Sequence, residues 1–169
     1  MKVSTFAIRL WRLVSLAGFA TMLIYTYVSL ETNVAVGFTP DSRPDVFMSR
    51  DYLFYSCVAI FLINNTLINT LTKLFPKVDG TKLPIPNQQL WIENRDQLNE
   101  IFRNWFYCLM AAVKTIMALS LYVLGRLNSQ LGSTNLSGHQ WLLPVCTAII
   151  AIVIVSLPIR LALKPAAEE

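Results

Sequence analysis

Charged residues are scarce in this 169-residue chain. Asp, Glu, Lys and Arg make up 14% of the sequence, whereas they make up about 25% of a typical soluble domain. Hydrophobic residues make up 54%, and they are gathered into continuous runs rather than alternating with polar residues. This composition excludes an ordinary soluble enzyme, and the continuous runs exclude the alternating pattern of a membrane β-barrel. The sequence therefore predicts an integral membrane protein built from helices.

Residues that support catalysis or metal binding are also scarce. The chain has one histidine, His139, and three cysteines, Cys57, Cys108 and Cys146, which lie in three different apolar runs without a C-x-x-C motif. This spacing gives no support to a zinc or dithiol redox motif. The sequence also lacks a nucleophile elbow, a phosphate-binding loop and an H-E-x-x-H motif. We therefore expect no enzymatic activity, no metal and no cofactor, and the absence of a basic patch argues against a nucleic-acid partner.

Four apolar runs are each long enough for a membrane-spanning helix, because about 20 residues cross a hydrocarbon core of about 30 Å. They predict spans at about residues 10–30, 52–73, 103–125 and 141–160. The predicted fold is an all-α integral membrane protein, a four-transmembrane-helix bundle that forms a single domain over residues 1–169. The loops between the predicted spans cover residues 31–51, 74–102 and 126–140.

Lysine and arginine are distributed unequally between the two sides that these loops define. Ten lie in or beside the N-terminal segment, the second loop and the C-terminal segment: Lys2, Arg9, Arg12, Lys73, Lys77, Lys82, Arg95, Arg103, Arg160 and Lys164. Three lie in the other two loops: Arg43, Arg50 and Arg126. Because short cytoplasmic loops are enriched in Lys and Arg, we expect both termini and loop 74–102 to be cytoplasmic. Loops 31–51 and 126–140 should then lie outside.

The second half of loop 74–102 has a helical pattern. Trp91, Leu98, Ile101, Phe102 and Trp105 recur at helical spacing, with charged residues between them. This pattern predicts an amphipathic, interfacial helix that lies at the inner membrane surface and runs into the third span. Its apolar face is explained equally by a solvated helical extension and by a surface that docks a partner.

Lys114 lies near the middle of the third predicted span, where a lysine costs about 2.5 to 3.5 kcal/mol on insertion scales. None of the ten acidic residues lies inside an apolar run, so its partners must be neutral groups, trapped water or an acid from another molecule. Asn65, Asn69 and Thr72 share one face of the second span, with Asn64 beside it. We therefore predict an intramembrane polar cluster of these residues with Lys114. The alternative is a lysine that extends along a lipid-facing surface.

Two loop segments contain short motifs. Segment 34–50 reads VAVGFTPDSRPDVFMSR, and segment 83–95 reads LPIPNQQLWIENR. They resemble the motifs of a bacterial domain-of-unknown-function family of small membrane proteins, approximately V-x-x-H-F-x-x-x-G-x-P-D-G-W-x-S-R and I-N-x-P-N-x-x-Y-W-x-x-x-x-R. The matching residues are Pro44, Asp45, Ser49 and Arg50 in the first segment and Pro86, Asn87, Trp91 and Arg95 in the second. The chain departs from the family at Gly37, Ser42, Val46 and Phe47, and Gly37 replaces a histidine, so no proton or metal role of that histidine carries over.

The resemblance implies a four-span, multi-pass protein of the bacterial cytoplasmic (inner) membrane. The same domain is found in SdpI-type immunity proteins, which protect bacteria against secreted toxins and in some cases relay a signal. The matching residues also have a purely structural interpretation. Asp45 and Ser49 would cap the second span, Arg50 would anchor at the headgroups, and the Pro86-Asn87 pair would shape a turn.

Three functions therefore stay open. The first is a non-enzymatic interaction role of the immunity or sensing type, in which the first outer loop engages a peptide or another partner. The second is an accessory subunit of a larger membrane protein complex. The third is a small transporter, which is disfavoured because proton or cation coupling usually relies on carboxylates inside the membrane. In each case the chain contacts membrane lipid.

Overall fold

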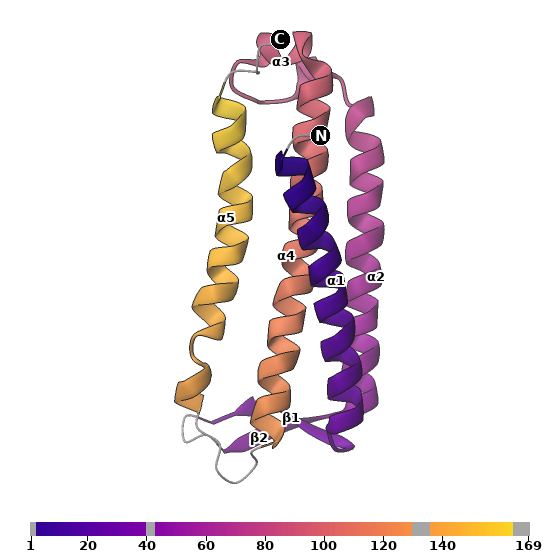
Figure 1. Cartoon of the computed structure of the whole chain (residues 1–169), viewed down its shortest axis with the longest axis vertical. Helices are drawn as coiled ribbons and strands as arrows, with labels where there is room; N and C mark the ends of the chain where they lie inside the picture. The colour runs from indigo at the N-terminus through magenta and orange to yellow at the C-terminus, as the bar shows by residue number, and fades with distance from the viewer. Residues whose placement is uncertain (1–2, 40–42, 130–135, 164–169) are drawn as a thin grey trace.

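Four long helices form the body of the protein, of which the computed structural model describes residues 3–39, 43–129 and 136–163. They are α1 (Val3–Ser29), α2 (Arg50–Leu74), α4 (Arg95–Ser129) and α5 (Leu142–Ala162), and they run side by side along the long axis (Figure 1). Each is long and apolar enough to cross a membrane. The architecture is therefore that of a multi-pass helical bundle, and the predicted spans fall almost entirely within these four helices.

The short elements lie at the two ends of the bundle. One end has the strands β1 (Asn33–Phe38) and β2 (Pro44–Ser49), and the short helix η3 (Leu136–His139) precedes α5. The other end has η1 (Phe75–Lys77), η2 (Gly80–Lys82) and α3 (Gln88–Glu93), and both chain termini lie there (Figure 1). We call these the hairpin end and the termini end. The unequal distribution of Lys and Arg along the sequence thus separates these two ends.

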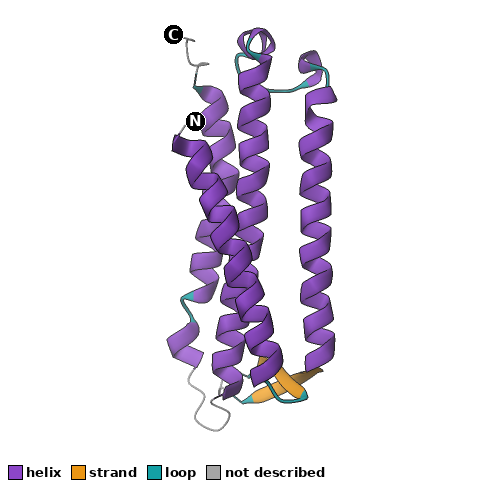
Figure 2. Ribbon diagram, turned by 45° about the vertical axis from the view of Figure 1, so that its right-hand side comes forward, coloured by secondary structure: helices purple, strands orange, loops and turns teal. Residues whose placement is uncertain are grey.

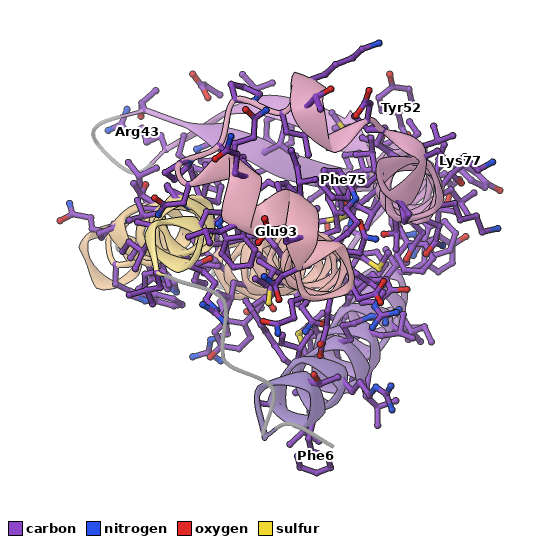
Figure 3. All side chains as sticks on the ribbon, turned by 90° about the horizontal axis from the view of Figure 1, so that it is seen from above. Phe6, Arg43, Tyr52, Phe75, Lys77 and Glu93 are labelled. Carbon is purple, nitrogen blue, oxygen red and sulfur yellow. The ribbon has the colours of Figure 1, made fainter. Side chains whose placement is uncertain are left out.

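The helix α4 lies at the centre of the bundle and contacts α1, α2, α5 and β1. Figure 3, seen from the termini end, shows α4 with α5 on one side and α1 and α2 on the others. Three buried clusters follow α4 along its length: Phe19, Leu23 and Leu121; Ile68, Phe106 and Met110; and Trp91, Leu98 and Leu161. Most large apolar side chains of α2 and α5 point outward, as expected for helices whose outer faces meet lipid.

The hairpin was not predicted from the sequence, so the fold is not entirely helical. The strands β1 and β2 pair antiparallel across the hairpin end (Figure 2). An isolated two-stranded hairpin is marginally stable in water, so it depends on packing against other elements. Val34 and Ala35 of β1 are both 0% exposed, which shows that this part of β1 is buried against the bundle.

The residues of the expected interfacial helix are helical, but they are divided between two helices. Trp91 lies in α3, whereas the residues from Arg95 onward belong to α4, which continues without a break along the bundle axis (Figure 1). Part of the apolar face is buried inside the bundle. Leu98 is 0% exposed and packs with Trp91 against Leu161 of α5. Burial against α5 is a tertiary contact, which helical periodicity alone does not distinguish from contact with lipid.

Candidate functional site

The hairpin is attached to the bundle by the side chain of Asn128, near the end of α4. Its Oδ1 accepts a hydrogen bond from the backbone N–H of Ala35 at 2.8 Å, and its Nδ2 donates to the carbonyl oxygen of Ala35 at 3.0 Å. The amide side chain thus pairs with β1 much as a neighbouring strand would. Because Ala35 is fully buried, its backbone groups depend on Asn128 for their hydrogen bonds.

This contact determines which strand has an open edge. Both backbone groups of Ala35 point toward Asn128, so Ala35 and the opposite residue, Phe47, form a non-hydrogen-bonded pair of the ladder. The N–H and C=O of Phe47 must then point away from β1, along the outer edge of β2. Successive residues of β2 point alternately toward and away from β1. Arg50, three residues after Phe47, should therefore point toward the chain of β1, and its N–H does donate to the carbonyl of Thr32 at 2.9 Å.

The open edge of β2 is flanked by exposed apolar side chains. Val46 is 52% exposed and Phe47 is 55% exposed. Because successive side chains of a strand point to opposite faces, one of them lies on each face of the hairpin. The edge therefore combines unsatisfied backbone groups with apolar contact area, which is the combination that an added strand recognises.

The other motif residues of the first loop hold the hairpin in place. Ser49 is the N-cap of α2, and its hydroxyl accepts from the N–H of Tyr52 at 3.2 Å, as the structural interpretation predicted. The guanidinium of Arg50, which we expected to anchor at the headgroups, contacts residues of the first helix and its end. It donates to the carbonyl of Leu30 at 3.1 Å and lies 4.7 Å from the ring centroid of Tyr27. Arg50 therefore joins the start of α2 to the end of α1.

Gly37, Pro44 and Asp45 lie in the hairpin itself. Pro44 begins β2 and has no N–H, which shortens the edge available to another strand. Asp45 is exposed, and its Oδ1 lies 2.9 Å from the position that a Cβ at Gly37 would occupy. The same Cβ would lie 2.8 Å from the Cβ of Val46. The histidine that the resembled family has at this position would therefore require the facing part of β2 to move.

The motif residues Arg95 and Trp91 of the second loop also donate hydrogen bonds to backbone carbonyls of other elements. Arg95 donates to the carbonyls of Phe75 and Val78, at 3.3 and 2.6 Å, and its guanidinium lies 5.5 Å from the Phe75 ring centroid. Figure 3 labels Phe75 between the end of α2 and the helix that contains Glu93. The indole N–H of Trp91 donates to the carbonyl of Leu161 at 3.1 Å, and the Trp91 side chain is fully buried. These contacts join the loop at the termini end to α4 and α5.

The turn between η2 and α3 is shaped by local backbone geometry. Asn87, which follows Pro86, has a φ of 55° and precedes the first residue of α3. Asparagine tolerates this left-handed conformation better than most residues, so the predicted Pro-Asn turn is confirmed. Earlier in the loop, hydrogen bonds from Thr81 lower the pKa of the Asp79 carboxyl, and the positive charge of Arg95 acts in the same direction. Asp79 therefore stays ionised at neutral pH and caps η2.

Lys114 lies inside the bundle, with 5% of its side chain exposed. Its ammonium nitrogen lies 5.2 Å from the ring centroid of Phe61, within the range of a cation–π contact. Phe61 stacks in turn on Phe19 of α1, with ring centroids 5.3 Å apart. Arg12 of α1 is close enough to Lys114 for a repulsive Coulomb interaction. This burial argues against the alternative, in which the lysine extends along a lipid-facing surface.

The polar side chains predicted to surround Lys114 lie along α2. The Nδ2 of Asn64 donates to the carbonyl of Met110, one turn before Lys114, at 3.3 Å. The Nδ2 of Asn65 donates to the carbonyl of Phe61 at 2.7 Å, and the hydroxyl of Thr72 donates to that of Ile68 at 2.8 Å. Asn69 is exposed. The cluster with Lys114 therefore stays a prediction, while Asn64 is tied to the turn of α4 that precedes it.

Several contacts between helices could not be predicted from the sequence. The indole of Trp11 donates to the hydroxyl of Thr115 at 3.2 Å, and the indole of Trp105 donates to the carbonyl of Val153 at 2.7 Å. The contact of Asn128 with β1 could not be predicted from the sequence, because its partner, Ala35, lies 93 residues earlier. The hairpin did have one, since two short runs rich in Val and Phe flank a segment rich in Pro, Asp and Ser.

The described residues contain no group of three or more His, Cys, Asp or Glu side chains that could hold a metal ion. The three cysteines, Cys57, Cys108 and Cys146, carry free thiols. Comparison of the chain with protein-family models, with curated proteins and with solved structures gives no match.

Proposed function

We propose that this chain is a non-enzymatic, multi-pass membrane protein whose hairpin recognises an extended polypeptide, in a role of the immunity or sensing type. The polypeptide would pair with the outer edge of β2 as a third strand. Backbone hydrogen bonds would supply affinity, and contacts with Val46 and Phe47 would supply specificity. The observation that carries this proposal is the difference between the two edges of the hairpin.

That difference is built into the ladder. The edge of β1 is occupied by Asn128, which pairs with both backbone groups of Ala35. The edge of β2 presents the N–H and C=O of Phe47 beside two side chains that are more than half exposed. Natural proteins usually protect an exposed edge with a charge, a proline or a bulge, and here Pro44, the exposed Asp45 and the register shifts opposite them protect the start of β2. The rest of this edge is free to pair.

The proposal places the hairpin end outside the cytoplasm of a bacterial cell. Its support is the charge distribution, since the termini end has ten of the Lys and Arg residues that flank the helices and the hairpin end has three. A hairpin on that side would meet secreted polypeptides. Because Asn128 belongs to α4, and α4 runs the full length of the bundle, a strand bound at the hairpin would act directly on the element that reaches the termini end.

Photo-crosslinking at Val46 tests this function. A benzoylphenylalanine residue at position 46 should give a covalent adduct with a secreted polypeptide when cells are irradiated in medium conditioned by the same strain. Phe47→Pro should abolish the adduct, because it removes the outward N–H while leaving the ladder to β1 intact. Phe47→Ala is the matched control, since it shortens the same side chain but keeps the N–H.

Other adducts would count against the proposal. An adduct with lipid alone would show that the hairpin rests on the membrane surface. A stoichiometric adduct with a larger membrane protein, recovered also after purification in mild detergent, would favour the alternative role of an accessory subunit. Equal crosslinking in the Phe47→Pro and Phe47→Ala proteins would show that strand pairing at this edge is not the mode of binding.

A further inference from the structure

A groove opens at the termini end between α1, α4 and α5. It has a volume of about 370 Å³, and Ile8, Gln97, Trp105, Cys108, Leu157 and Arg160 are among the residues that line it. The floor is formed by α4, with α1 on one side and α5 on the other; Figure 3 looks down on this arrangement. The hairpin and the proposed strand-binding edge lie at the opposite end of the bundle, so the groove is a separate site (Figure 1).

The lining of the groove changes from polar to apolar along α4. Gln97 and Glu100 line it near the start of α4, and Arg160 lies near the end of α5. Deeper along the bundle the lining includes Trp105 and Cys108. From Gln97 to Cys108 the helix rises about 16 Å, which is close to half of a hydrocarbon core of about 30 Å. The groove therefore has the length and polarity of one membrane leaflet, with its polar end toward the termini.

The charges at the polar end are not equivalent. The carboxylate of Glu100 accepts a hydrogen bond from the hydroxyl of Thr5 at 3.3 Å, and Asn104 donates to the same hydroxyl at 3.5 Å. These contacts tie the acid and the amide to α1. Within the part of the chain that the structure describes, Arg160 has no hydrogen-bond or ion-pair partner. Its guanidinium is therefore the charge at the groove mouth that is available to a ligand.

We infer that this groove binds one anionic phospholipid from the leaflet on the side of the termini. The lipid phosphate would pair with Arg160, and an acyl chain would lie along Trp105 and Cys108. An arginine suits this role because its planar guanidinium recognises phosphate oxygens through two parallel hydrogen bonds. A membrane-spanning helix of a partner fits less well, since it needs about 20 residues of contact and the groove covers about three turns of α4.

Native mass spectrometry tests the inference with defined lipids. The full-length protein is equilibrated with equal amounts of phosphatidylglycerol and phosphatidylcholine with identical chains, and the lipids that stay bound on release from detergent are counted. We expect one retained lipid and about a fivefold preference for phosphatidylglycerol, because one basic residue near an anionic lipid surface contributes about 1 kcal/mol. Inorganic phosphate added to the sample should not displace the lipid, which distinguishes a lipid from a free anion.

Two variants separate the contributions of headgroup and chain. Arg160→Gln should remove the preference while leaving the protein folded, and Arg126→Gln, at the hairpin end, should leave the preference unchanged. Cys108→Trp should fill the groove and abolish retention of both lipids, and Cys146→Trp, at a half-buried position of α5 that does not line the groove, is its control. Equal retention by wild-type and Cys108→Trp protein would overturn the inference. So would an unchanged preference in Arg160→Gln, or a polypeptide bound in place of lipid.

Discussion

Two arginines of the loop motifs make the same kinds of contact at opposite ends of the bundle. Arg50 donates to a carbonyl at the end of α1, and Arg95 donates to carbonyls that follow the end of α2. Each also lies over an aromatic ring, of Tyr27 and Phe75 respectively. The last carbonyls of a helix have no partner within it, so a planar, many-donor side chain is well suited to satisfy them. Lysine should substitute poorly at either position.

Asn128 is the residue on which the hairpin depends. Asn128→Ala removes both hydrogen bonds to Ala35 and leaves two buried backbone groups without partners, so we expect a loss of about 2 kcal/mol or more. Thermal unfolding of the purified protein in detergent measures this change. Ser129→Ala is a suitable control, because that exposed hydroxyl bonds only within its own helix. If both variants unfold at the same temperature, Asn128 does not stabilise the hairpin.

Lys114 places a positive charge in the core of a predicted span. Its described contact is the ring of Phe61, and Arg12 opposes it with a like charge. Lys114→Met keeps most of the length of the side chain and removes the charge, so we expect the protein to gain about 1 kcal/mol, or about 2 to 4 °C in unfolding temperature. Lys73→Met, which changes an exposed lysine near the end of α2, is the control.

The opposite result for Lys114 would be equally informative. A lower unfolding temperature for Lys114→Met would mean that the ammonium has polar partners whose loss is costly. It would favour the predicted cluster with Asn65 and Asn69. A double variant with Asn65→Leu would then measure the coupling between the two residues.

At the scale of elements, the first two turns of α4 belong to the core of the termini end. Leu98 is fully buried between Trp91 and Leu161, whereas Gln97 lines the groove. Leu98→Asp puts a carboxylate into this cluster, so we expect a loss of about 3 kcal/mol or more, while Gln97→Glu should change stability little. Denaturation in detergent, followed by tryptophan fluorescence, compares them. Equal tolerance of both substitutions would contradict the burial of this face.

At the scale of the whole molecule, the two ends of the bundle differ in charge and in structure. The proposed orientation places the termini end in the cytoplasm. A reporter fused after Glu169 should therefore report the cytoplasm, and one inserted near Ser133, which lies outside the described residues, should report the other side. The reverse pattern would place the hairpin inside the cell and remove the support for recognition of secreted polypeptides.

The sequence by itself determined the four long helices, their order and the separation of charge between their ends. Hydropathy and helical period are local properties, and runs such as 141–160 contain enough apolar residues to form a helix wherever they pack. The N-cap at Ser49 and the turn at Asn87 were also predictable, because each depends on residues nearby in the sequence.

The tertiary structure decided everything that depends on residues far apart in the chain. The open edge of β2 exists because Asn128 occupies the edge of β1 from 93 residues away, and the face of α4 around Leu98 is buried because α5 returns to it. The groove at Arg160 likewise requires α1 and α5 to meet α4 side by side. Periodicity predicts that a face is apolar, but only packing determines whether lipid, another helix or a ligand covers it.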